Sequence, residues 1–336
     1  MKNNKQLMYP SIALIVPYFG KLPNYFPLWL ESCRENPTID WYIFSDDKTE
    51  YDYPENVYFT YMTFNEATEL FQKKFDFKIK LLDPYKLTDF KPTYGEVFSD
   101  YVQDYDFWGF CDVDLIFGNI RKFITKDILN NYDKILANGH FVLLRNNILN
   151  NNIFRENING KMKYEDVYSD KKHRGFDEYG DEAFHSICKE SHLKIYINNL
   201  IYADINSWKK HFTLTYARRL VLPKELPVLE WEEKDKNHCT IFSFNNGDLI
   251  RYFIKNNQIQ KHEYMYVHFQ KRRMDVQLSQ IDNKFLMVPN KFIDHIDKIN
   301  IDILRKLGKK KFISSRRWKR RIYITIRMFI KNKFGI

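Results

Sequence analysis

The chain has few cysteines and no long apolar stretch, and these two absences exclude several classes of protein. Its 336 residues include four cysteines, none in a C-x-x-C spacing: Cys33, Cys111, Cys188 and Cys239. The usual zinc patterns are therefore excluded, and reduced thiols in the cytoplasm are expected. No apolar run reaches the ~18 residues that a membrane-spanning helix needs. The polar residues 1–10 predict that there is no signal peptide.

Acidic residues are absent from the end of the chain. Residues 305–336 contain 13 lysines and arginines and no aspartate or glutamate, whereas the rest of the chain has 40 basic and 43 acidic residues. The net charge of +10 is therefore a property of the tail. In a nucleic-acid-binding protein we expect the basic residues to form a stripe on the fold itself. Nucleic acid is thus not expected as a partner.

The basic tail also carries apolar residues in a helical stripe. Five of them would share one face of a helix: Trp318, Ile322, Ile326, Phe329 and Ile330. A helix with such a face and basic flanks is expected to lie in a membrane interface, on anionic headgroups. A basic arm for nucleic acid is the alternative, but it would need no apolar stripe. We predict that residues 291–336 form a basic amphipathic tail on the inner face of the plasma membrane.

Upstream of the tail, the chain has the composition of a globular protein. Its hydrophobic content of 44% and aromatic content of 17% allow one large α/β domain or two small ones. Short β-branched or aromatic runs predict strands, and the Asn-Gly pairs at 138–139 and 246–247 predict hairpin turns. The first strands are expected at Ser11–Val16, Trp41–Phe44 and Val57–Met62. The Asn-rich segment 146–168 has no clear period, and a mobile segment is expected there.

The rest of the chain is organised around Tyr105–Asn119. The apolar run 107–111 predicts a buried strand, and Asp112 and Asp114 follow it directly. Ligands of open α/β sheets bind beyond the carboxyl ends of strands, and two carboxylates placed there can bind one hard cation. Asp-x-Asp is also a common chance pattern. A second copy at 104–106 precedes the strand, where a solvated turn is expected.

Three other positions leave alternatives open. Lys86 and Asp89 would share a helix face, either to hold a sugar or diphosphate, or as a surface ion pair worth ~0.3–0.5 kcal/mol. Without further context the surface pair is favoured. Asp46, at the end of the second strand, either contacts a ribose or base or forms a turn. His268, near the end of a strand at 264–269, is either structural or the nitrogen ligand in a mixed set that suits Mn²⁺.

The order of four motifs resembles that of bacterial GT-A-type glycosyltransferases. They are a strand followed by PYFG, a strand followed by SDD, then YKLTDFKPTYG, then FWGFCDVDLIFG. More closely, the chain is similar to an uncharacterised family of capsule and lipopolysaccharide cluster proteins that carry K-x-x-D-F-K-P-x-Y-G before W-x-x-C-D-x-D. The resemblance covers residues 11–273.

The resemblance implies a GT-A-like α/β fold with a mostly parallel central sheet flanked by helices. The domain would span residues 1–290, with a donor half at about 1–145 and an acceptor half at about 146–290. The nucleotide pocket would be lined by Pro17, Tyr18, Phe19 and Asp46. The donor would be contacted by Lys86, Asp89 and Lys91, and its diphosphate by Lys271 or Arg272. The metal ligands would be Asp112, Asp114 and His268.

The resemblance also gives an expected activity. The chain would be a hexosyltransferase-like enzyme that uses Mn²⁺ or Mg²⁺ and a nucleotide-sugar donor. The expected donor is a UDP-sugar. Its acceptor would be a lipid-linked sugar or a surface polysaccharide such as capsule, O-antigen or lipopolysaccharide. Asp177 or Glu178 would accept the proton of the acceptor hydroxyl. The alternative is that the acidic residues near this point merely favour the start of a helix at 181–191.

Two other classes of function remain open on the sequence. A sugar-phosphate transferase or nucleotidyltransferase would use the same metal chemistry and release a different product. A non-catalytic carbohydrate-binding protein would need no metal pair, so it would bind saccharides equally with and without Mn²⁺.

Overall fold

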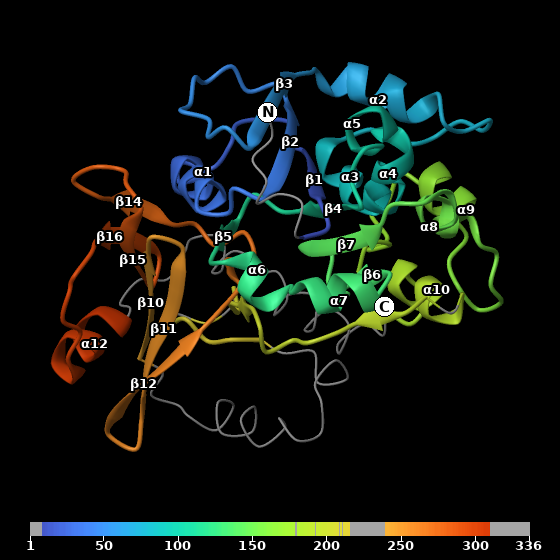
Figure 1. Ribbon diagram of the computed structural model, residues 1–336. Helices are drawn as coiled ribbons and strands as arrows, with labels where there is room; N and C mark the ends of the chain where they lie inside the picture. The colour runs from blue at the N-terminus through green and yellow to red at the C-terminus, as the bar shows by residue number, and fades with distance from the viewer. Residues whose placement is uncertain are drawn as a thin grey trace, which may run out of the picture.

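The computed structural model describes residues 9–178, 180–191, 193–207, 209, 211–215 and 239–309. Within these residues the strands form three sheets, and helices cover the largest of them (Figure 1). No helix of the described residues combines the length and apolar character that a membrane span requires. All four cysteines are buried and free.

The largest sheet has seven strands in the order β3-β2-β1-β4-β7-β6-β8. The first four in this order are parallel, and β7 is antiparallel to both β4 and β6. The predicted mostly parallel central sheet is therefore confirmed. The strands are β1 (Ile12–Pro17), β2 (Ile39–Ser45), β3 (Val57–Tyr61), β4 (Phe107–Cys111), β6 (Lys134–Ile135), β7 (Phe141–Arg145) and β8 (Ile195–Tyr196).

The central strands are buried on both faces because successive side chains point to opposite sides. In β1, Leu14 packs into one hydrophobic cluster and Ile15 into the other. Helices α1 (Phe26–Arg34), α6 (Ile120–Phe123) and α7 (Lys126–Asn131) contribute to the first cluster. The second cluster includes residues of α2 (Phe64–Gln72), α3 (Leu87–Phe90), α4 (Tyr94–Val97), α5 (Ser99–Val102), η4 (Ile153–Arg155), α9 (Tyr164–Ser169) and α10 (Phe184–Glu190).

Segment 146–168, expected from its composition to be a mobile acceptor-side loop, is largely helical. It contains α8 (Ile148–Asn152), η4 and most of α9. Phe154 and Tyr168 are fully buried against the central sheet's second hydrophobic cluster. The expectation was wrong because a few large aromatic side chains anchor an otherwise polar segment.

A second sheet of six strands has the order β12-β11-β10-β15-β16-β14. Its strands are β10 (Thr240–Asn245), β11 (Asp248–Lys255), β12 (Gln258–Glu263), β14 (Asp275–Gln277), β15 (Lys284–Val288) and β16 (Lys291–Asp294). The predicted hairpin turn at Asn246-Gly247 is confirmed, with positive φ angles of 49° and 84°. Helix α12 (Ile301–Gly308) packs on this sheet through Leu304. Residues 291–308 therefore pack with the second sheet, and the predicted amphipathic stripe at 318–330 lies outside the described residues.

A small sheet of three strands joins distant parts of the chain. It consists of β5 (Leu115–Phe117), β13 (Tyr266–His268) and β9 (Ala203–Asp204), in that order. Strand β13 is antiparallel to β5 and parallel to β9. Its register sets His268 opposite Leu115, which directly follows Asp114, and opposite Asp204. This sheet positions the candidate site.

Candidate metal and ligand site

Asp112 and Asp114 lie in the tight connection between β4 and β5. Val113 between them is buried in the core, whereas the side chains of Asp112 and Asp114 are 34% and 13% exposed. His268 Nε2 lies 3.3 Å from Asp114 Oδ1 and 4.0 Å from Asp112 Oδ2. One ligand atom from each of these three residues lies within 4.8 Å of the others. The structure thus brings together the three residues predicted as metal ligands.

Asp204 is a fourth member of the cluster that the sequence did not indicate. Its Oδ1 lies 2.8 Å from His268 Nδ1. Its Oδ2 accepts hydrogen bonds from Gln270 Nε2 at 2.7 Å and from Thr215 Oγ1 at 2.6 Å. The carboxylate therefore holds the imidazole with Nε2 directed toward the aspartate pair. No local pattern around Asp204 could have indicated this, because its position depends on the pairing of β9 with β13.

The cluster has the composition of a divalent metal site. Two carboxylates and one imidazole nitrogen form a mixed oxygen and nitrogen set that suits Mn²⁺, and carboxylates alone suit Mg²⁺. A carboxylate on the far nitrogen of a ligating histidine is the usual support for such a ligand. Burial would lower the pKa of His268, but Asp114 and Asp204 raise it well above its usual value. A metal would displace this proton, because ligating histidine must be neutral.

Lys91 connects the aspartate pair to a second carboxylate. Its Nζ donates to Asp112 Oδ1 at 2.7 Å and to the carbonyl of Gly139 at 2.8 Å. It also lies 3.1 Å from Asp177 Oδ2. Burial would lower the pKa of Lys91, but Asp112 and Asp177 outweigh it and raise that pKa. Lys91 is therefore a buried cation that holds Asp112 through Oδ1, while Oδ2 is the oxygen nearest to His268.

Gly139 permits the close approach of Asp177. A Cβ atom at position 139 would lie 2.4 Å from Asp177 Oδ2, closer than real Cβ contacts allow. Burial raises the pKa of Asp177 to about 7, against the opposing charge of Lys91. The neighbouring Glu178 is exposed. The two candidate bases thus differ: Asp177 is tied to Lys91 in the interior, and Glu178 faces solvent.

Lys86 and Asp89 do not form the surface ion pair that the sequence alone favoured. They form an ion pair of 2.7 Å in which both side chains are buried. Lys86 Nζ also donates to the carbonyls of Val167 and Lys172. The Asp89 carboxylate accepts from the backbone N–H groups of Arg174 and Phe176, each at 2.9 Å. The surface alternative is therefore wrong; the pair holds the loop that leads to Asp177, and its contact with a donor stays a prediction.

The residues predicted to line the nucleotide pocket have different surroundings. Phe19 is buried, with its ring centroid 5.5 Å from that of Phe64, so it belongs to the core. Asp46 Oδ1 accepts from the backbone N–H of Gly20 at 2.7 Å, so Asp46 ties together the loops after β1 and β2. Pro17 is the last residue of β1. Tyr18 is half-buried, and burial together with the charges of Asp114 and Asp47 raises its pKa.

The two basic residues after β13 have different surroundings. Arg272 is buried, and its guanidinium donates to Asn290 Oδ1 and to the carbonyls of Asn206 and Lys209. It therefore holds these segments together. Lys271 is exposed, and its backbone N–H donates to Asp114 Oδ2 at 2.6 Å. Its Nζ lies 3.7 Å from the ring centroid of Tyr85.

The chain belongs to a protein family described as "Family of unknown function (DUF6625)", whose model matches residues 14–296. No curated protein matches the chain. Solved glycosyltransferases are similar to it at a low level. One is the galactosyltransferase LgtC in complex with donor and acceptor sugar analogues, at 12% identity, with 77% of this chain and 87% of that chain covered and a TM-score of 0.36.

Two further solved structures show likeness of the same order. For mouse xyloside xylosyltransferase 1 in its apo form, identity is 11%, coverage is 60% of this chain and 89% of that chain, and the TM-score is 0.34. For the apo glycosyltransferase GlyE of Streptococcus pneumoniae TIGR4, identity is 12%, coverage is 82% of this chain and 58% of that chain, and the TM-score is 0.31.

Proposed function

We propose that the protein is a metal-dependent glycosyltransferase that moves a sugar from a nucleotide diphosphate donor to a surface-polysaccharide acceptor. The observation that supports it most is the cluster of Asp112, Asp114 and His268 at the carboxyl end of β4, with Asp204 behind the histidine. This edge of a mostly parallel sheet is where ligands of α/β proteins bind. A UDP-sugar is the first donor to test.

The three side chains would hold Mn²⁺ or Mg²⁺. A divalent ion there would neutralise the charge that develops on the leaving diphosphate. Lys91 keeps Asp112 in place through a buried hydrogen bond. The exposed ammonium group of Lys271 would contact the diphosphate, because the backbone N–H of the same residue is bonded to Asp114. Arg272 would contribute by holding the loop rather than by touching the donor.

The acceptor hydroxyl needs a group that takes its proton. Asp177 and Glu178 are the candidates, and their surroundings suggest different roles. Asp177 has a pKa raised to about 7 by burial, which is in the range of a general base, but its carboxylate is tied to Lys91. Glu178 is exposed and so able to meet an acceptor directly. Variants Asp177→Asn and Glu178→Gln separate them, because only the loss of the base abolishes transfer while donor binding persists.

The acceptor is proposed to be lipid-linked at the inner membrane leaflet, with the basic tail docking the enzyme there. Truncation after Lys311 should release the protein from anionic liposomes and leave donor hydrolysis nearly unchanged, because each basic residue near the surface contributes about 1 kcal/mol. Co-sedimentation of the truncated protein at the same salt concentration would exclude the tail as the anchor.

The activity is tested by incubating the protein with a panel of nucleotide-sugars and Mn²⁺. Release of the nucleoside diphosphate is the expected result, and it should stop when the metal is chelated. Release of a nucleoside monophosphate and a sugar phosphate would instead indicate a sugar-phosphate transferase. Saccharide binding that is equal with and without Mn²⁺, together with no donor hydrolysis, would indicate a binding protein.

A further inference from the structure

The connection between β6 and β7, residues 136–140, has an unusual backbone. Leu136 is buried, yet its φ is 64°, in the left-handed region that bulky residues rarely adopt. Such strain persists only where the surrounding structure holds it, and it is concentrated at functional sites. The connection leads directly to the candidate metal site. The carbonyl of Gly139 accepts from Lys91, and the carbonyl of His140 accepts from the N–H of Asp112.

His140 joins the largest sheet to the small sheet. Its backbone carbonyl lies 3.1 Å from the N–H of Asp112, where the ladder between β4 and β7 ends. Its ring packs beside β13, with its centroid 4.4 Å from that of His268 and 5.5 Å from that of Tyr266. One residue therefore contacts two of the three proposed metal ligands, Asp112 through its backbone and His268 through its ring.

The ring of His140 is itself fixed by buried hydrogen bonds. Its Nδ1 lies 3.0 Å from the hydroxyl of Tyr266, and its Nε2 lies 3.3 Å from Asn138 Nδ2. Asn138 also donates to the hydroxyl of Tyr202 at 2.7 Å, and the rings of Tyr202 and Tyr266 are stacked with centroids 5.1 Å apart. All four residues are buried. This network leaves the His140 ring little freedom, so it forms a rigid surface against His268.

The two contacts of the His268 ring restrain different motions. Asp204 Oδ1 holds one edge of the ring, 2.8 Å from Nδ1, and so determines which nitrogen faces the aspartate pair. A hydrogen bond at one edge leaves the ring free to tilt about that edge. The ring of His140 blocks such a tilt on its side, because the two rings are already in contact, with their planes inclined by 35°.

We propose that His140 is a positioning residue of the metal site, which keeps the imidazole of His268 in the orientation that a bound ion needs. The proposal rests on the proposed function for the presence of that ion. A ligand role for His140 is the alternative, because one of its nitrogens lies within 4.8 Å of ligand atoms of Asp204 and His268. Both of its nitrogens, however, already have partners, in Tyr266 and Asn138.

The test measures the Mn²⁺ affinity of the full-length protein by calorimetry, with a thermal melt of each variant. His140→Ala removes the ring and should weaken Mn²⁺ binding about 10- to 100-fold, the usual range for groups that orient a metal ligand. His140→Phe keeps a flat ring against His268 and loses both hydrogen bonds. It should therefore melt below the wild type and still recover most of the Mn²⁺ affinity that His140→Ala loses.

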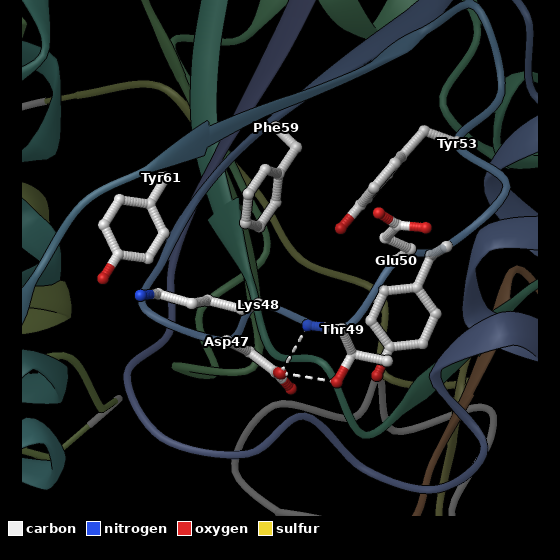
Figure 2. A pocket seen from close by; sticks show the side chains of 8 residues that line it. Asp47, Lys48, Thr49, Glu50, Tyr53, Phe59 and Tyr61 are labelled. Atoms are coloured by element: carbon white, nitrogen blue, oxygen red, sulfur yellow. Dashed lines mark hydrogen bonds between the residues drawn. The ribbon is translucent and has the colours of Figure 1, made fainter.

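Two matched controls separate positioning from a general loss of packing. His185 of α10 is as buried as His140, and its Nδ1 lies 3.2 Å from Lys134 Nζ. Phe59 of β3 packs on Tyr53 with ring centroids 5.3 Å apart, in the wall of a cavity beside the loop after β2 (Figure 2). Strand β3 is three places from β4 in the sheet. His185→Phe and Phe59→Leu should lower the melting temperature and leave Mn²⁺ affinity unchanged.

Four results would overturn the inference. Mn²⁺ affinity that is unchanged in His140→Ala would exclude any role at the site. An equal loss in His140→Ala and His140→Phe would assign the effect to the hydrogen bonds instead of the ring contact. A loss in His140→Phe as large as that in His268→Ala would make His140 a ligand. A similar loss in His185→Phe would assign the effect to general destabilisation.

Failure of the proposed function has a different signature. Mn²⁺ would bind and respond to the His140 variants, while no nucleotide-sugar is hydrolysed. Donor hydrolysis by the wild type, together with unchanged Mn²⁺ affinity in His140→Ala, would refute the role of His140 alone. A wild-type protein that binds no Mn²⁺ would overturn both.

Discussion

Two ion pairs of lysine and aspartate, Lys86 with Asp89 and Lys91 with Asp112, have the same nitrogen–oxygen distance. In both, the lysine Nζ lies 2.7 Å from a carboxylate oxygen. The side chains of Lys86 and Asp89 are 1% and 0% exposed, whereas those of Lys91 and Asp112 are 7% and 34% exposed. The distance is therefore uninformative about role. A structural pair and a site pair differ in the exposure of the carboxylate and in the group that its second oxygen contacts.

The two pairs differ most in the contacts of the second carboxylate oxygen. In Asp89 both oxygens accept from backbone N–H groups of one loop, in addition to Lys86. In Asp112 one oxygen meets Lys91, while the other faces His268 Nε2 at 4.0 Å. The first carboxylate is saturated by the protein. The second keeps an oxygen available for a cation.

The largest effect is expected for the site carboxylates. Asp112→Asn and Asp114→Asn should each lower turnover by about a thousandfold or more, because a bound divalent ion supplies several kcal/mol of transition-state stabilisation. Thermal stability should change little. Nucleotide release and a thermal melt measure the two quantities. Asp104→Asn, in the exposed Asp-x-Asp at the other end of the strand, is the control, and wild-type turnover in either site variant would remove the cluster from the mechanism.

The opposite pattern is expected for the buried pair. Asp89→Asn should lower the free energy of unfolding by about 3–5 kcal/mol, because it leaves Lys86 charged, buried and unpaired. Chemical denaturation measures this. The double variant Lys86→Met with Asp89→Leu should recover much of the stability, since apolar replacements of buried ion pairs are often neutral. If the double variant were as unstable as the single one, the contrast between the two pairs would fail.

A smaller effect is expected behind the histidine. Asp204→Asn should weaken Mn²⁺ binding by about 10- to 100-fold, the usual range for a residue that orients a metal ligand. Calorimetric titration with Mn²⁺ measures the affinity. Thr215→Val removes one hydrogen bond to the same carboxylate and should cost less. An Mn²⁺ affinity that is unchanged in Asp204→Asn would mean that Asp204 does not orient His268 for metal binding.

The smallest effect concerns the exposed lysine. Lys271→Ala should raise the KM for the nucleotide-sugar by about tenfold, since hydrogen bonds to charged groups contribute roughly 1.5–3 kcal/mol. The kcat should change less than the KM. Arg273→Ala, an exposed basic residue two positions away, serves as the control. Equal shifts in both variants would mean that only general positive charge matters there.

The sequence predicted the centre of the site better than its surroundings. Asp112, Asp114 and His268 could be proposed because two follow a buried strand and the third ends one, and strand ends are readable in a sequence. Asp204 could not be proposed, because its place depends on the register between β9 and β13. Asp204 and His268 are 64 residues apart in the sequence, so their pairing leaves no local pattern.

The sequence also did not predict that several charged side chains are buried. Lys86 and Asp89 satisfy each other and the backbone of a loop more than 80 residues further on. Arg272 likewise binds carbonyls more than 60 residues earlier. Charged residues are rarely buried unless paired, so a sequence alone favours placing them at the surface or at a ligand. Here tertiary hydrogen bonds reverse that expectation.

The small sheet of β5, β13 and β9 also determines when the site is completed during synthesis of the chain. Asp112 and Asp114 leave the ribosome long before His268, and the backbone contact between Lys271 and Asp114 spans 157 residues. Contacts at such separation form late, since the intervening chain must first be closed into a loop. An unfinished polypeptide therefore has the carboxylates without their histidine. The full set of side chains proposed to bind a cation is therefore present only after synthesis has passed the last strand of that sheet.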